Sequence, residues 1–247
     1  MEEHELIRRA EDLAAQCARK NRLTATAFLT PAERRLLEQR FAHVARRPVV
    51  SGGHPDCERT LAFFLPDYLE PEELELPEHI RVIRLTAHFG TPGHRDYMGA
   101  LLGMGIARDR LGDIWVAGDT ATVFCLPGVE KHLLSIDKVG RVGVTAEALP
   151  LGEAQPPERK VKAVTFSVMS PRLDAVTAGM FRLSRTEAAR RIALGMVIVN
   201  DLVSDKADMQ LHEGDVLSLR GAGKGRLVSF GGNSRKGRLF VNAEIYH

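Results

Sequence analysis

Two amphipathic stretches at the start of the chain predict two helices. In the first, apolar side chains recur every three or four residues, at Leu6, Ile7, Ala10, Leu13, Ala14 and Cys17. The second has the same pattern at Leu36, Leu37, Phe41 and Val44, after Thr30, Pro31 and Glu33. Threonine followed three residues later by glutamate is a capping box, and proline is favoured in the first helical turn. With short strand patterns near Val49 and Leu61, residues 1–77 are expected to form an α+β region.

Residues 78–150 alternate strand and helix patterns in the order βαββαβ. Strands are predicted at 81–85, 114–116, 121–125 and 139–145, with helices around 97–104 and 129–136. This order is that of ferredoxin-like folds, which RNA-recognition modules share and in which they stack bases on exposed sheet aromatics. Phe124 is the only aromatic residue on the expected central strands. Base stacking by this domain therefore has little support in the sequence.

Residues 151–160 include Pro156 and Pro157 and indicate a linker. In the following segment, 161–247, a helix is expected at 172–180. Ser184, with Glu187 three residues later, caps a second helix that Gly195 ends. Strands at 196–199 and 216–219 are expected to follow, so the whole chain is predicted to be α+β.

The charge is unevenly distributed along the chain. The 247 residues are 44% hydrophobic and 27% charged, as in an ordinary globular protein, and carry a formal net charge of +2. Residues 159–247 hold 15 Lys and Arg against 8 Asp and Glu, a net +7, which leaves 19 against 24, a net −5, for the rest. A basic domain on an acidic body is typical of a polyanion-binding protein, although a solvated basic face has the same charge.

An arginine cluster at the start of the second C-terminal helix is the strongest chemical signal. Arg185 joins the unpaired N–H groups and the positive dipole end of that helix, where a phosphate is stabilised. For any single arginine a solvated helix face is an equally good explanation, but the cluster favours contact with RNA. The predicted RNA-binding residues are Arg172, Arg182, Ser184, Arg185, Thr186, Arg190, Arg191, Asn200, Lys206, Lys224 and Arg226, with His94 and Arg95 as a possible secondary contact.

The tail alternates basic residues with glycines before a closing hairpin expected at 239–245. Its basic residues are Arg220, Lys224, Arg226, Arg235, Lys236 and Arg238. They fit a flexible basic loop over RNA and a solvated hairpin turn equally well.

Two family resemblances emerge from these motifs. SRTEAARRI, GMVIVN and the later EGD turn resemble the S-four RNA-binding domain, with Asp201 where that family usually has glycine. HRDYMGALLGMGIARDRLGDIWV, VFCLPGVEKHL and KVGRVGVT resemble the bacterial YlmH family, and this likeness extends over nearly the whole chain. It implies a factor bound to ribosomal RNA and tRNA on stalled large subunits that still carry peptidyl-tRNA, alongside a C-terminal tailing factor, with a link to cell division.

Several sequence features imitate other functions. Arg172, Leu173 and Asp174 imitate the catalytic loop of pseudouridine synthases, but too few residues follow for that fold. His94, Arg95 and Asp96 spell a kinase triplet without the other kinase motifs. His54 and Cys57 have ligand-like spacing without a second pair nearby, so a turn is expected there. The expected function is non-enzymatic, without metal, cofactor or small-molecule substrate.

Two alternative functions remain open from the sequence. One is an RNA-modifying enzyme that uses His88, His94, Arg95 and Asp96, and the other is a scaffold that recruits a division or translation partner through the acidic body. No membrane span or basic signal peptide is found, so a cytoplasmic location is expected.

Overall fold

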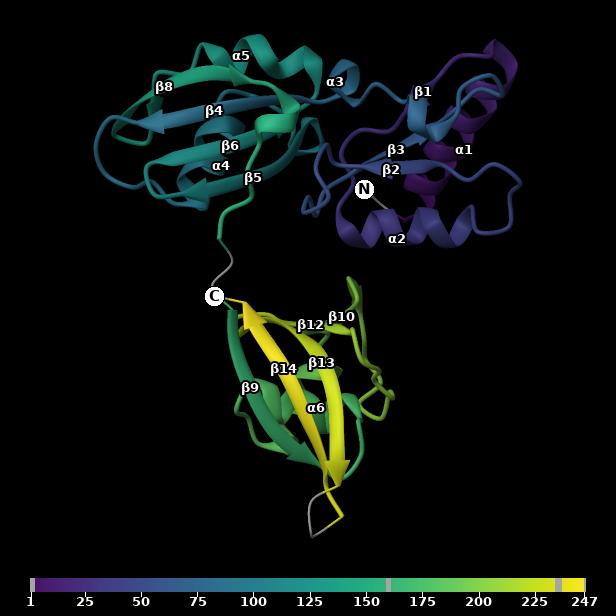
Figure 1. The fold of residues 1–247 in the computed structure, drawn as a ribbon, viewed down its shortest axis with the longest axis vertical. Coiled ribbons are helices and arrows are strands. Elements are labelled where there is room, and N and C mark those ends of the chain that lie inside the picture. The colour runs from purple at the N-terminus through teal and green to yellow at the C-terminus, as the bar shows by residue number, and fades with distance from the viewer. Residues whose placement is uncertain (1–2, 159–160, 234–236, 247) are drawn as a thin grey trace. The chain divides into compact units, whose positions relative to one another are not determined.

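The computed structural model describes residues 3–158, 161–233 and 237–246. The chain forms two compact units, one up to Glu158 and the other from Arg159. Both combine helices with antiparallel sheets, which confirms the predicted α+β composition (Figure 1). No helix within the described ranges is long and apolar enough to cross a membrane.

The first unit begins with two helices packed on a small sheet. Helices α1 (Glu3–Lys20) and α2 (Pro31–Arg40) cover one face of β1 (Thr24–Ala25), β3 (Leu61–Phe64) and β2 (Val49–Ser51), in the order β1-β3-β2. The capping box forms as predicted: the Glu33 N–H donates to Thr30 Oγ1 at 3.3 Å, and the Thr30 N–H donates to the Glu33 carboxylate at 2.7 Å.

A five-stranded sheet forms the rest of this unit. Its strands are β4 (Arg81–Ala87), β5 (Leu111–Ala117), β6 (Thr120–Cys125), β7 (Lys138–Val139) and β8 (Val142–Leu149), in the antiparallel order β5-β6-β4-β8-β7. Helices α4 (His94–Gly103) and α5 (Glu130–Leu134) pack on one face. Short helical turns complete the unit: η1 (Pro71–Glu73), α3 (Leu76–His79), η2 (Arg108–Arg110), η3 (Pro127–Val129) and η4 (Leu151–Glu153).

The two sheets of this unit share one hydrophobic core. Phe28 and Phe63 from the N-terminal region pack in the same cluster as Phe124 and Trp115 from the second sheet. Ala154, expected in the linker, is 2% exposed in this cluster. The structure thus differs from the expected linker at 151–160, because the chain stays on the body until its last apolar side chains are buried.

Charged side chains brace the same junction. Arg59 donates to the carbonyl oxygens of Leu111, at 3.1 Å, and Phe28, at 2.8 Å. The Asp113 carboxylate accepts the N–H groups of Glu58 and Arg59 at 2.8 and 2.9 Å. The bonds to Leu111 and Asp113 join segments more than fifty residues apart, so they fix the N-terminal region against the second sheet.

Gly112→Ala is expected to destabilise the first unit by about 1–3 kcal/mol, because overpacking forces a well-packed core to shift. An added Cβ at Gly112 would lie 2.7 Å from the Phe28 ring and 2.9 Å from Phe124 Cβ. Urea denaturation measures the loss, and Gly99→Ala in α4, where an added Cβ meets nothing within 4 Å, is the control. Equal stability of the two variants would contradict the shared core.

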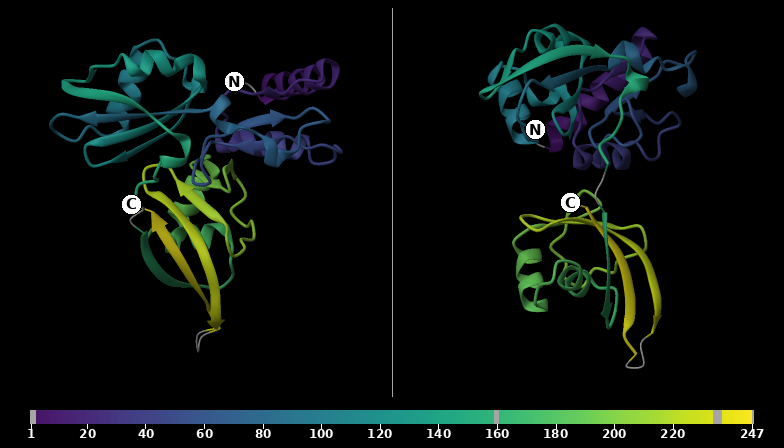
Figure 2. Two further views of the ribbon diagram at one scale, coloured as in Figure 1. Left: turned by 45° about the horizontal axis from the view of Figure 1, so that its top comes forward. Right: turned by 60° about the vertical axis from the view of Figure 1, so that its left-hand side comes forward.

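The second unit is a six-stranded antiparallel sheet with two helices on one face. The strands are β9 (Val161–Val168), β10 (Val197–Val199), β11 (Leu202–Val203), β12 (Val216–Leu219), β13 (Gly223–Asn233) and β14 (Leu239–Tyr246), in the order β11-β10-β12-β13-β14-β9. Helices α6 (Leu173–Met180) and α7 (Arg185–Ala193) both pack on one face of this sheet, as the right-hand view of Figure 2 shows.

Local turn chemistry matches the sequence patterns. Ser184 Oγ accepts the Glu187 N–H at 3.1 Å, and Gly195 ends α7 with a φ of +65°. Asn200 and Asp201 have φ values of +47° and +69°, as a two-residue hairpin with both central residues left-handed requires. Asp201 thus adopts the conformation for which glycine is usual.

The interpretation of the basic tail as a flexible loop is wrong for Lys224 and Arg226, because both lie on β13, paired with β12 and β14. Glycines permit this pairing where the backbones approach closely, since an added Cβ at Gly225 would lie 2.7 Å from the Glu244 carbonyl oxygen. Arg235 and Lys236 lie outside the described residues.

Candidate nucleic-acid interface

The arginines at the start of α6 and α7 are organised by a buried carboxylate. Asp174, 6% exposed, accepts hydrogen bonds from Arg172 at 3.3 and 3.4 Å and from Arg185 Nε at 3.0 Å. The Arg185 side chain remains 57% exposed. One side of this guanidinium is therefore fixed by the protein, while the remainder can contact a ligand.

The ionisation of Asp174 reflects this arrangement. Burial alone raises the pKa of the carboxyl group, but hydrogen bonds from Arg172 and Arg185 and their positive charges outweigh it, so the pKa lies below its ordinary value. Asp174 is consequently ionised near neutral pH and is the negative partner of both arginines.

A second carboxylate orders the arginines further along α7. Glu187 accepts two hydrogen bonds from Arg190, at 2.8 and 2.9 Å, and one from Arg191 at 2.7 Å. Hydrogen bonds from Arg190, then from Arg191, lower the pKa of Glu187 to about 2. The carboxylate therefore stays charged and holds both guanidiniums over one helix face.

We call the arginines of α6, α7 and the turn between them the helix-start face: Arg172, Arg182 and Arg185 lie at the helix starts, and Arg190 and Arg191 lie in the last turn of α7. With Asp174 and Glu187 it carries a net charge of +3. Arg182 lies in the turn between the helices with a φ of +54° and has no ion pair within the described part of the chain. Thr186 is exposed in the first turn of α7, whereas the Ser184 hydroxyl is occupied as the helix cap.

The remaining predicted C-terminal residues lie elsewhere. The Asn200 side chain is occupied, because it donates to Asp215 at 2.7 Å and accepts the Val216 N–H at 2.9 Å. Lys206 is exposed in the segment between β11 and β12. Lys224 and Arg226 alternate on β13 with the buried Leu227, and so lie on the sheet face opposite the helices (Figure 2).

The predicted secondary contact lies on the first turn of α4, where His94 and Arg95 are both exposed. Their neighbour Asp96 accepts the Gly93 N–H at 2.8 Å and so caps the helix. His88 bonds to Thr145 Oγ1 at 2.8 Å. The four residues considered for an RNA-modifying reaction thus include two that the fold itself uses.

Phe124, the aromatic residue considered for base stacking, is not accessible. Phe124 is 0% exposed, and Trp115, on the neighbouring strand, is 9% exposed. Their rings contact each other at a centroid distance of 4.7 Å within the shared core. A base cannot stack on Phe124 without unfolding this junction.

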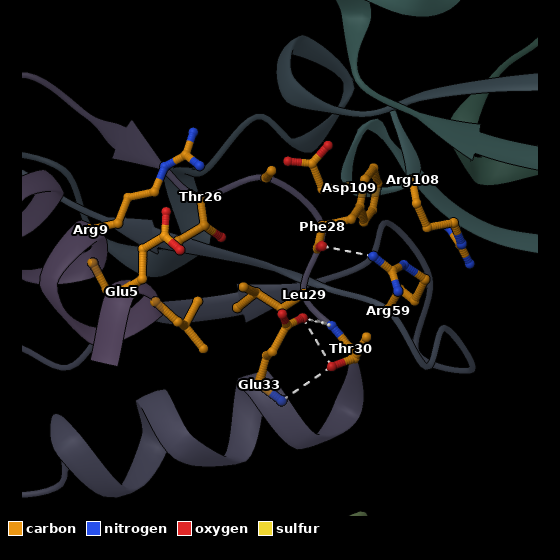
Figure 3. A pocket seen from close by; sticks show the side chains of 13 residues that line it. Glu5, Arg9, Thr26, Phe28, Leu29, Thr30, Glu33, Arg59, Arg108 and Asp109 are labelled. Carbon is orange, nitrogen blue, oxygen red and sulfur yellow. Dashed lines mark hydrogen bonds between the residues drawn. The ribbon is translucent and has the colours of Figure 1, made fainter. Parts of the chain in front are cut away.

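A pocket of about 530 Å³ lies between α1 and the segment leading into α2 (Figure 3). Its polar lining is largely committed to the fold: Arg59 donates to the Phe28 carbonyl oxygen, and Thr30 and Glu33 cap α2. Burial and the neighbouring Arg59 charge lower the pKa of Arg108 to about 10, and this residue binds the carbonyl oxygens of Leu111 and Gly112. In this lining the Thr30 hydroxyl donates to the Glu33 carboxylate at 2.9 Å, and both groups are used in the cap of α2.

The metal-like spacing of His54 and Cys57 belongs to a turn. His54 Nδ1 accepts the Asp56 N–H at 3.1 Å, and Cys57 is buried, which raises the pKa of its thiol to about 12. Across the described ranges, no group of three His, Cys, Asp or Glu side chains is placed to hold a metal ion.

Sequence reasoning found the arginines but not the two carboxylates that order them. Glu187 stands three and four residues before Arg190 and Arg191, and this spacing on a helix was a usable signal. Asp174 meets Arg185 across eleven residues, so only the packing of α6 on α7 reveals that contact.

Comparisons with known proteins place these observations in context. A family model described as a putative RNA-binding domain in YlmH matches residues 71–153. The chain is 31% identical over 225 residues to the ribosome-associated protein quality control protein P2 of Bacillus subtilis (strain 168), covering 90% of this chain and 87% of the relative. Its fold resembles that of the cell division protein ylmH from Streptococcus pneumoniae, with a TM-score of 0.54 and 20% identity, over 62% of this chain and 94% of that chain.

Asp174→Asn is expected to lower the free energy of unfolding by about 1–3 kcal/mol at pH 7, because a buried acceptor for charged donors is weakened. The folded pKa is depressed, so this stabilisation is present above the unfolded pKa of about 4 and is lost as the pH falls through the folded pKa. Denaturation from pH 7 to pH 2 tests the sign. A stability difference independent of pH would contradict it, and Glu187→Gln, with a more exposed carboxylate, should cause a much smaller loss.

Proposed function

The chain belongs to the YlmH family, and we propose that it is a non-enzymatic RNA-binding protein of the bacterial cytoplasm that acts on the ribosome. We further propose that it binds the large subunit at ribosomal RNA and tRNA near stalled peptidyl-tRNA. Its role there is in ribosome-associated quality control, alongside a tailing factor and with a link to cell division. The name of the Bacillus subtilis relative supports the ribosome and quality-control parts.

The observation that carries this proposal is the helix-start face. Guanidiniums held in place by carboxylates lose less side-chain freedom when they bind phosphate, and each presents a fork that matches phosphate oxygens. Such contacts fix position and orientation on RNA without reading its sequence. Because the bases of an A-form duplex are poorly accessible, recognition of RNA shape is the expected mode.

The domain assignments are part of the proposal. The order β5-β6-β4-β8 with two helices on one face supports a ferredoxin-like domain at 78–150. The capped α7, the strand after Gly195 and the turn before β12 support an S-four domain within 161–247. The N-terminal α+β region, 1–77, would then be a support that covers part of the ferredoxin-like sheet.

Arg185→Ala combined with Arg190→Ala is expected to weaken co-sedimentation with purified large subunits at near-physiological salt. If each arginine contacts one phosphate, the slope of log affinity against log salt should become shallower by about 1 per lost contact. Binding to separated subunits over a salt series measures both quantities.

Arg8→Ala combined with Arg19→Ala, two exposed arginines of α1, is the matched control and should leave the salt slope unchanged. If the Arg185 and Arg190 variant bound like the wild type, the helix-start face would be the wrong surface.

A further inference from the structure

In the first unit, part of one face of the five-stranded sheet is covered neither by a helix nor by the N-terminal region. Helices α4 and α5 cover one face, and the N-terminal region covers Val82, Trp115 and Phe124 on the other. The strand residues beyond them are polar and at least partly exposed: Arg84, Thr86, Thr122, Thr145 and Glu147. Arg84 Nη1 donates to the Glu147 carboxylate at 3.3 Å across β4 and β8. Thr86 is paired with Thr145 and Arg84 with Thr122, so these side chains form one contiguous strip of hydrogen-bonding groups.

An exposed aromatic side chain stands at the end of this strip. Phe89, in the loop between β4 and α4, is 71% exposed, more than any other large hydrophobic side chain that the structure describes. Figure 1 shows this loop at the end of the sheet away from the N-terminal helices. Unlike Phe124, Phe89 offers an accessible ring.

His88, the residue before Phe89, is held to β8 by two hydrogen bonds, so the start of this loop is fixed in place. The His88 N–H donates to the Gly143 carbonyl oxygen at 2.9 Å, and His88 Nε2 bonds to Thr145 Oγ1 at 2.8 Å. The His88 and Phe89 rings meet edge to face at a centroid distance of 6.4 Å. Gly90 follows with a φ of +75°, which turns the chain back toward α4.

Charged side chains of both signs lie at this end of the sheet. Arg95 lies on the first turn of α4, and Arg141 lies in the turn that precedes Val142. The Val142 side chain would lie 3.8 Å from a Cβ added at Gly90. Asp119 and Asp137 are exposed at the same end of the sheet, where their backbone carbonyls bind the N–H groups of Ala87 and Val144. The nearly balanced charge gives this end little general attraction for a polyanion, so a ligand here would be held mainly by the ring and the polar strip.

We propose that Phe89 and the adjoining polar strip form a second RNA contact, which holds an unpaired nucleotide by stacking on the ring and by hydrogen bonds from the hydroxyls of Thr86 and Thr122 and from the Arg84 N–H groups that Glu147 does not occupy. This contact rests on the proposed function, because it presumes that the chain works on RNA. It would complement the helix-start face: that face holds phosphates of a structured element, and this one captures a base that has left its helix.

Phe89→Ala in the full-length chain tests the proposal, with fluorescence anisotropy of a labelled oligoadenosine RNA and of a labelled RNA duplex. Loss of one stacked base should weaken oligoadenosine binding by about 5- to 100-fold and leave duplex binding unchanged. Phe89→Trp keeps a stacking surface and should retain the affinity. Tyr68→Ala, which removes another exposed aromatic side chain (64% exposed), is the matched control and should have no effect.

The salt dependence separates this contact from the helix-start face. Stacking releases no counterions, so Phe89→Ala should lower oligoadenosine affinity by the same factor at every salt concentration, whereas the Arg185 and Arg190 variant should change the slope. Combining Phe89→Ala with that arginine variant removes the background of phosphate binding. Unchanged oligoadenosine affinity after Phe89→Ala in both backgrounds would overturn the second contact and leave the proposed function standing. Loss with Phe89→Ala beside a silent arginine variant would support the second contact and would overturn the helix-start face as the phosphate-binding surface.

Discussion

The buried carboxylate of Asp174 is the contact on which the C-terminal surface depends. Placing a charge among apolar side chains costs free energy unless charged partners hydrogen-bond to it. Arg172 and Arg185 meet that requirement, and in doing so they are drawn to one place from two helices. The position of α7 on α6 and the direction of the exposed guanidiniums therefore follow from one requirement for a counter-charge. Glu187 extends the same principle along α7 in a more exposed setting.

In the first unit, three charged side chains bond to the backbone of the fold. Arg59 and Arg108 direct their guanidiniums at backbone carbonyls, and Asp113 accepts two backbone N–H groups. Arg59 and Asp113 join the two sheets, and Arg108 holds the start of β5, so all three groups are already bonded within the fold. The contrast explains why the number of arginines in a sequence is a poor guide to RNA contact: what matters is whether the rest of the fold already occupies each guanidinium.

The sequence predicted the features that depend on neighbouring residues. The Thr30 capping box, the Ser184 cap and the left-handed Gly195 all formed, because each is decided within one turn of chain. It did not predict the shared core around Phe124, since an apolar pattern says that a face is buried but not what buries it. The contact between Asp174 and Arg185 likewise depended on helix packing, and the strand pairing of Lys224 depended on glycines that usually indicate a loop. The predicted RNA contacts remain predictions.

The shared core of the first unit also affects how the chain folds during synthesis. Leu149 and Ala154 close a cluster that begins with Phe28, so the last pieces of this core are made more than a hundred residues after the first. Phe28, Phe63 and Phe124 must wait, partly uncovered, until β8 has left the ribosome. The second unit begins only after that closure, at Val161 in the described residues, so the nascent chain can complete one core before it starts the next.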